Sequence, residues 1–215
     1  MERLKGEASF WYPYMRILPK SFDVTVFWTE AELSELQDDN IIQAAVNQQA
    51  WKKSREKSGD LGTEVHSLIE HSCKRILGFI EPRPDVSDEA IAVYGDWDRW
   101  ARDVRLQPVV AEKAVASLTH RFAGRFDLVA WVEGRLSLLD WKTSKDVYPE
   151  MRMQSAAYRQ GLREHGWPEM DAHIVRLPKD GGRIHAVKVE EPVADLFRAF
   201  LGALEMHRFL KGYEK

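Results

Sequence analysis

The chain has 215 residues, 44% of them hydrophobic and 30% charged, which suits one large domain with its own core. A formal net charge of −3 gives no whole-protein signature of nucleic-acid binding, although a local basic patch is compatible with it. The single cysteine, Cys73, excludes an intrachain disulfide and a thiolate metal cluster. There is no apolar run of 18 residues and no signal or transit peptide at the start, so we expect a cytoplasmic protein without a membrane span.

The first half of the chain is predicted to be mainly helical. Residues 1–28 are aromatic and punctuated by proline, which is typical of an extended arm. Residues 29–57 are helix-prone, and two further helices are expected over 63–77, where Gly78 ends the pattern, and over 87–104.

The pattern then changes to β-branched segments bounded by turn residues. Strands are expected over 107–119, 121–134 and 135–143, with a hairpin at Glu133-Gly134 between the last two. The expected elements that follow are a helix over 149–166, strands over 171–177 and 183–189, and a helix over 192–211. This order predicts an α/β or α+β fold with a central mixed sheet of about five strands flanked by helices.

A carboxylate and an ammonium stand side by side at the end of one predicted strand. Side chains alternate between the faces of a strand, so Asp140 and Lys142 share one face, and Leu139 and Trp141 share the other. Buried charge is costly unless it is paired or liganded, so this strand end is a candidate functional site. The alternative is a structural ion pair between Asp140 and Lys142.

Further polar residues occur on neighbouring predicted elements. His66 and Glu70 lie four residues apart on one helix face, and Asp127 lies on the strand that pairs with the strand of Asp140. Two carboxylates and an imidazole without sulfur form a ligand set that favours Mg²⁺ or Mn²⁺ over structural zinc. A plain salt bridge of Asp127 with Arg125 remains the alternative.

Four motifs in this order resemble those of the PD-(D/E)XK nuclease superfamily, specifically its RecB-like exonuclease branch. The motifs are GTEVHSLIE (62–70), GRFDLV (124–129), LLDWKTSK (138–145) and QSAAY (154–158). The resemblance implies a restriction-endonuclease-like core over 60–190 within a single nuclease domain, 1–215. Residues 1–57 and 79–105 would then be helical and aromatic additions that form an N-terminal lobe.

The resemblance also assigns roles to individual residues. The implied catalytic residues are Lys142, Asp140 and Asp127. The implied metal ligands are His66, Asp127, Asp140, the backbone carbonyl of Trp141 and, for a second ion, Glu70. The implied substrate-binding residues are Gln154, Tyr158, Lys145 and Arg125, and Glu112 matches an acidic position that often precedes the metal strands.

The implied function is a DNA exonuclease that uses one or two Mg²⁺ or Mn²⁺ ions and prefers single strands or DNA ends. An endonuclease or RNase on the same core, a non-catalytic nucleic-acid-binding recombination module, and a structural domain with an ion-pair network are the alternatives. One cysteine cannot supply an iron–sulfur cluster, and the chain has no GxxxxGK[ST] loop for ATP. A bacterial or phage-encoded enzyme with a recombination or replication partner is expected.

Overall fold

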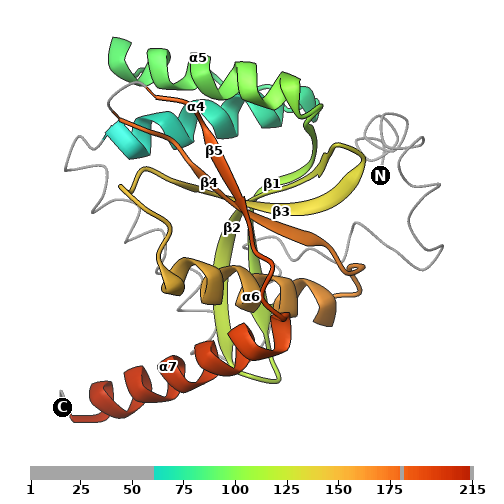
Figure 1. Cartoon of the computed structure of the whole chain (residues 1–215), viewed down its shortest axis with the longest axis vertical. Helices are drawn as coiled ribbons and strands as arrows, with labels where there is room; N and C mark the ends of the chain where they lie inside the picture. The colour runs from blue at the N-terminus through green and yellow to red at the C-terminus, as the bar shows by residue number, and fades with distance from the viewer. Residues whose placement is uncertain (1–60, 180–181, 214–215) are drawn as a thin grey trace.

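The structure is a computed structural model that describes residues 61–179 and 182–213 (Figure 1). The expected arm over 1–28 and the expected helix over 29–57 lie outside the described residues. In chain order the elements are α4 (Leu61–Ile76), α5 (Asp88–Asp103), β1 (Gln107–Ser117), β2 (Phe122–Val132), β3 (Arg135–Lys142), α6 (Pro149–Glu164), β4 (Asp171–Arg176), β5 (His185–Lys188) and α7 (Val193–Tyr213).

The strands form a five-stranded mixed sheet in the order β1-β2-β3-β4-β5. All neighbouring pairs are antiparallel except β3 and β4, which are parallel and are connected through α6. A parallel pair needs a crossover of this kind, because a tight turn can only join antiparallel strands. The predicted fold class of a mixed sheet flanked by helices is therefore confirmed.

The predicted hairpin between β2 and β3 is also confirmed. Val132 pairs with Arg135, which leaves Glu133 and Gly134 as a two-residue turn. Both turn residues have positive φ values, 49° and 78°. This is the geometry of the type I′ turns that suit the twist of paired strands.

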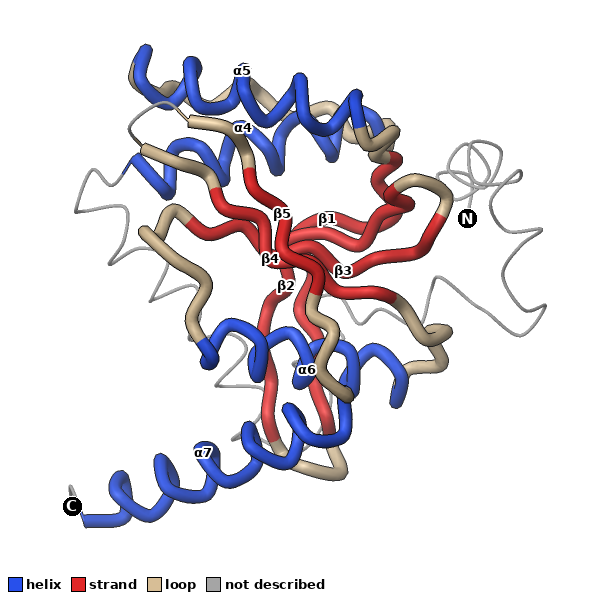
Figure 2. Tube along the Cα trace, in the orientation of Figure 1, coloured by secondary structure: helices blue, strands red, loops and turns tan. Residues whose placement is uncertain are grey.

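Helices α4 and α5 lie on one face of the sheet and α6 on the other (Figure 2), and an apolar cluster joins the layers on each face. The first core cluster joins α4 and α5 to the sheet and includes Val65, Leu68, Trp97, Leu139 and Trp141. The second core cluster joins α6 to the opposite face and includes Phe126, Leu138, Tyr158, Leu162 and Ile174.

The link between α4 and α5 is polar as well as apolar. Ser87 is the N-cap of α5, and its hydroxyl accepts a hydrogen bond of 3.2 Å from the backbone N–H of Ala90. The carboxylate of Glu64 accepts hydrogen bonds from the backbone N–H and the hydroxyl of Ser87. The start of α5 is thus tied to the first turn of α4.

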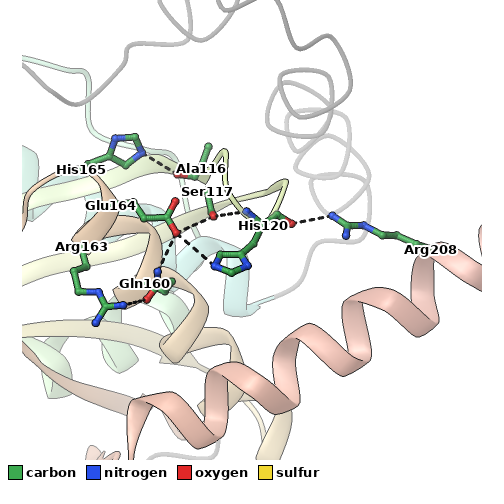
Figure 3. Close-up of polar contacts among 8 residues, drawn as sticks. All are labelled: Ala116, Ser117, His120, Gln160, Arg163, Glu164, His165 and Arg208. Carbon is green, nitrogen blue, oxygen red and sulfur yellow. Dashed lines mark hydrogen bonds and ion pairs between the residues drawn. The ribbon is translucent and has the colours of Figure 1, made fainter.

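The tip of the β1–β2 hairpin is clamped between α6 and α7 (Figure 3). Ser117 Oγ donates to Glu164 Oε1 at 3.0 Å and accepts from the backbone N–H of His120 at 3.0 Å. Arg208 on α7 donates to the backbone carbonyls of His120 and Arg121 at 3.1 and 2.6 Å. β1 ends at Ser117, two residues before the predicted boundary.

Aromatic rings complete this contact between the hairpin and α7. The ring of Phe197 lies edge-on to His120 at 4.9 Å, and the ring of Phe200 lies 5.0 Å from Phe122.

Among the residues that the structure describes, no helix has both the length and the apolarity needed to cross a membrane.

Candidate active site

Asp140 and Lys142 lie at the carboxyl end of β3 and form an ion pair. Lys142 Nζ is 2.6 Å from Asp140 Oδ2. Leu139 and Trp141 belong to the first core cluster on the other face of the sheet, as strand alternation predicts. The buried apolar residues therefore orient both charged groups toward the face that carries α6.

Asp127 on β2 is bound to the backbone of the same strand end. The backbone N–H of Trp141 donates to Asp127 Oδ2 at 2.6 Å. The β2–β3 register pairs Leu128 with Leu139, so Asp127 and Asp140 occupy the next position along. Two carboxylates thus meet on adjacent strands.

Glu112 extends this row onto β1. Its neighbours Ala111 and Lys113 pair with Leu128 and Phe126, which places Glu112 beside Asp127 in the ladder. Glu112 has a φ of 52°, a left-handed conformation that non-glycine residues rarely adopt within a strand. Such backbone strain is concentrated at functional sites in proteins, which supports a role for this residue.

A chain of hydrogen bonds connects Lys142 to α6. Lys142 Nζ donates to Gln154 Oε1 at 3.2 Å, and Gln154 Nε2 donates to the hydroxyl of Tyr158 at 2.9 Å. Tyr158 is buried against Gly124, where an added Cβ atom would lie 2.4 Å from Tyr158 Cε1. The glycine of the GRFDLV motif therefore leaves space for the ring that orients Gln154.

The electrostatics of Asp140 reflect its burial. Desolvation raises the pKa of Asp140 to about 6 and the charge of Asp127 adds to this effect, whereas Lys142 and His66 act in the opposite direction. Burial also raises the pKa of Tyr158, and the nearby charges of Asp140, Asp127 and Glu112 reinforce the shift. Two neighbouring carboxylates in a site of low polarity favour a compensating cation.

The two aspartates and His66 are the candidate donors for a divalent cation. Apart from the ion pair with Lys142, the buried Asp140 Oδ2 has no hydrogen-bond partner in the described part of the chain. Within residues 61–179 and 182–213, no three His, Cys, Asp or Glu side chains are grouped as a metal site would require. Asp140 is paired with Lys142, and Asp127 accepts a hydrogen bond from the backbone N–H of Trp141. The residue types, oxygen donors with one imidazole, still fit Mg²⁺ or Mn²⁺.

The other predicted residues differ in how close they lie to this strand end. His66 on α4 is near enough for its charge to lower the pKa of Asp140. Glu70 is engaged one turn further along, where Lys74 Nζ lies 2.9 Å from its Oε1. Arg125 Nη1 lies 3.8 Å from Glu112 Oε2, and Lys145 is exposed in the loop after β3.

One basic residue at this edge was missed by the sequence reasoning. Arg176 is the last residue of β4 and the register partner of Lys142. Its guanidinium Nε donates to the backbone carbonyl of Ser144 at 3.3 Å. No motif marks Arg176, because its position depends on a parallel pairing between segments that lie more than 30 residues apart.

Comparison with known proteins identifies the family. The family model of the PD-(D/E)XK nuclease superfamily matches residues 25–211, which is more than half of the chain. The chain therefore belongs to this superfamily, and its five-stranded sheet with flanking helices is consistent with the restriction-endonuclease-like fold. The search of curated proteins gave no match.

Proposed function

We propose that this member of the PD-(D/E)XK nuclease superfamily is a divalent-metal-dependent DNA exonuclease that prefers single strands or DNA ends. Membership supports the coarser statement of a metal-dependent nuclease. The observation that carries the site assignment is the convergence of Asp127, Asp140 and Lys142 at one strand end, with a 2.6 Å ion pair between the last two. The exonuclease assignment depends on the resemblance of the four motifs to the RecB-like branch.

The proposed ligands of the ion are the carboxylates of Asp127 and Asp140, the imidazole of His66 and the carbonyl oxygen of Trp141. When bound, a divalent ion supplies polarisation of a phosphate oxygen and a lower pKa for a coordinated water. The chain's own contribution is to hold two carboxylates close together at a position where Asp140 is buried, and this burial raises the pKa of Asp140. Glu70, which pairs with Lys74, is the proposed ligand of a second ion.

Lys142 is proposed to act on the reacting phosphate. An ammonium cannot ligate a cation, but its charge stabilises the negative charge that develops on a phosphate in the transition state. Gln154 accepts a hydrogen bond from Lys142 Nζ. Because the amide of Gln154 is uncharged, this bond holds the ammonium in place without neutralising its charge. Tyr158 fixes the amide of Gln154 in turn.

The remaining residues are proposed to contact the substrate. Lys145 is exposed in the loop beside the site, where its ammonium can reach a phosphate. Arg125 and Glu112 form a pair 3.8 Å apart at the β1–β2 side of the site. Residues 79–105, which include α5, are proposed to belong to the lobe that contacts the strand.

Digestion of end-labelled oligonucleotides tests this proposal. Single-stranded DNA, double-stranded DNA, single-stranded RNA and a sealed single-stranded circle would each be incubated with Mn²⁺, with Mg²⁺ or with a chelator. We expect metal-dependent cleavage of linear single-stranded DNA and none of the circle. Equal cleavage of circles would favour an endonuclease, preference for RNA would favour an RNase, and binding without cleavage in either metal would favour the non-catalytic module.

Calorimetry with Mn²⁺ tests the ligand set separately from activity. The wild type should bind the ion, and Asp127→Ala should bind it much more weakly because one carboxylate of the pair is lost. The imidazole softens the donor set, so Mn²⁺ should support cleavage at a lower concentration than Mg²⁺. Undiminished binding by Asp127→Ala would contradict the proposed ligands.

A further inference from the structure

Arg176 continues the functional face of the sheet beyond Lys142. It pairs with Lys142 across the parallel β3–β4 ladder and with His185 across the antiparallel β4–β5 ladder. Register partners in neighbouring strands present their side chains on the same face of a sheet. The three side chains therefore form a row that leads from Lys142 toward β5.

The core clusters show which face this is. Val175 and Leu177 belong to the first core cluster, together with Leu139 and Trp141. Ile174 belongs to the second core cluster, on the face that carries α6. By alternation Arg176 shares the face of Ile174, which is also the face of Asp140 and Lys142.

Within the described residues, the guanidinium of Arg176 makes one hydrogen bond. One N–H donates to the carbonyl of Ser144 at 3.3 Å, and a guanidinium carries five N–H donors. Three other arginines of this half of the chain have carboxylate partners: Arg135 with Asp171, Arg152 with Glu191 and Arg159 with Glu169. Among the described residues, no carboxylate forms an ion pair with Arg176. Its position beside the site is therefore suited to an anion from outside the chain.

We propose that Arg176 binds the phosphate next to the scissile one and that the nucleic-acid backbone runs across the ends of β3 and β4 toward β5. Neighbouring strands lie about 4.8 Å apart, so Arg176 is offset from Lys142 by roughly one step along the substrate backbone. A guanidinium binds two oxygens of a phosphate at once, which fixes the register of the strand as well as adding charge. This inference rests on the proposed nuclease function and adds a specific phosphate contact and a path to it.

A purely structural role for Arg176 would be to hold the loop after β3. That loop has bonds of its own, because Ser144 Oγ donates to the carbonyl of Asp146 at 2.6 Å and the N–H of Val147 donates to Asp146 Oδ1 at 2.7 Å. The structural role also uses only one of the five donors. It predicts a change in stability on mutation, but no change in the salt dependence of binding.

The test compares Arg176→Gln, Arg176→Lys and a matched control with the wild type. Arg198→Gln removes the same charge from α7, where the arginine is exposed and pairs with Asp195. Binding of a labelled single-stranded oligonucleotide would be measured by fluorescence anisotropy with a chelator present, between about 50 and 200 mM salt. KM, kcat and melting temperature would be measured in parallel, with Mn²⁺ present for the kinetics.

Loss of one phosphate contact should reduce the slope of log K against log salt by about 0.7 for Arg176→Gln. KM should rise about tenfold, as expected for a lost charged hydrogen bond, while kcat stays within about threefold. Arg176→Lys should keep the wild-type slope but lose part of the affinity, because an ammonium cannot bind two oxygens in a fixed plane. Arg198→Gln should match the wild type in slope and KM.

The inference is overturned if Arg176→Gln keeps the wild-type slope and KM, whether or not its melting temperature falls. If Arg176→Gln does not fold, an unchanged KM for Arg176→Lys overturns the bidentate contact. A wild type that binds the oligonucleotide but does not cleave it contradicts the proposed nuclease function, while the slopes still decide the role of Arg176. A wild type that does neither refutes both proposals.

Discussion

Replacing Gly124 by alanine should disable the site from a distance, through Tyr158. An alanine Cβ would lie 2.4 Å from Tyr158 Cε1, 3.3 Å from Cζ and 3.4 Å from Cδ1. Non-bonded carbon atoms have their energy minimum at about 3.5–4.0 Å, so the ring must move by roughly 1 Å or more. The backbone at this position has ordinary negative φ, so the clash is with the side chain and not with the strand itself.

A displaced ring would break the chain of hydrogen bonds that leads to Lys142. The hydroxyl of Tyr158 would leave its 2.9 Å bond with Gln154, and the amide would no longer be held for its 3.2 Å bond with Lys142. Overpacking of this kind costs about 1–3 kcal/mol in stability. Misplacing the ammonium of Lys142, which is proposed to act in the transition state, should lower kcat by about tenfold to a hundredfold, with KM nearly unchanged.

Single-turnover cleavage at saturating DNA, measured beside a melting curve, would separate the two effects. Gly161→Ala is the matched control, because its Cβ would lie 2.8 Å from Val115 Cγ2 on β1, away from the bonds to Lys142. Tyr158→Phe keeps the ring and removes only the hydroxyl. Gly124→Ala and Tyr158→Phe should both slow cleavage, whereas Gly161→Ala should lower only stability. Equal cleavage by Gly124→Ala and Gly161→Ala would refute this reasoning.

Three further predictions concern other parts of the chain. Lys142→Ala should keep the fold and Mn²⁺ affinity but lower single-turnover cleavage by about 10²–10⁴-fold. Lys142→Arg should not restore cleavage fully. Near-normal cleavage by the alanine variant would make Lys142 only an ion-pair partner. Phe197→Ala removes the ring contacts of Phe197 with His120 and Phe122 and leaves that of Phe200 with Phe122, so hydrogen exchange in α7 should accelerate by a factor that reflects about 1–3 kcal/mol, and unchanged protection would contradict the clamp. Burial raises the pKa of Asp171, but Lys188 and Arg135 outweigh burial and hold the pKa below its usual value. The ionised carboxylate therefore stabilises the fold above about pH 4, and this stabilisation is lost as the pH falls through the lowered pKa. The melting temperatures of the wild type and Asp171→Asn should converge in acid.

Local patterns in the sequence were sufficient to predict the helices and strands of the described residues and the shared strand face of Asp140 and Lys142. Alternation along LSLLDWKT predicts that Asp140 and Lys142 share a face, because Leu139 and Trp141 must be buried on the other. The Glu133-Gly134 turn predicts the β2–β3 pairing, and with it the proximity of Asp127. Both inferences depend only on residues that are near in sequence.

Features that depend on long-range packing could not be predicted in this way. Propensity gives no reason for Glu112 to adopt a φ of 52° within a strand. The contact between Gly124 and Tyr158 requires α6 to cross β2, and the pairing of Lys142 with Arg176 requires the parallel crossover. The 2.9 Å pair of Glu70 with Lys74 has the (i, i+4) spacing of a helix-surface ion pair, whereas a ligand role for Glu70 was implied only by the resemblance.

The ring of Trp141 explains why a charged strand end can be held so firmly. It is almost fully buried, and its ring stands edge-on to those of Trp97 and Trp100 on α5, with centroids 5.8 and 6.3 Å away. Such aromatic pairs add roughly 0.5–1.5 kcal/mol each beyond the burial of area. Because the side chain of Trp141 is fixed on one face, its backbone is fixed too, including the N–H that is bonded to Asp127. The flanking residues Asp140 and Lys142 are held with this backbone. The apolar core of α5 and the proposed chemistry of β3 are therefore coupled through Trp141, and loosening the tryptophan cluster should disturb the site before it unfolds the sheet.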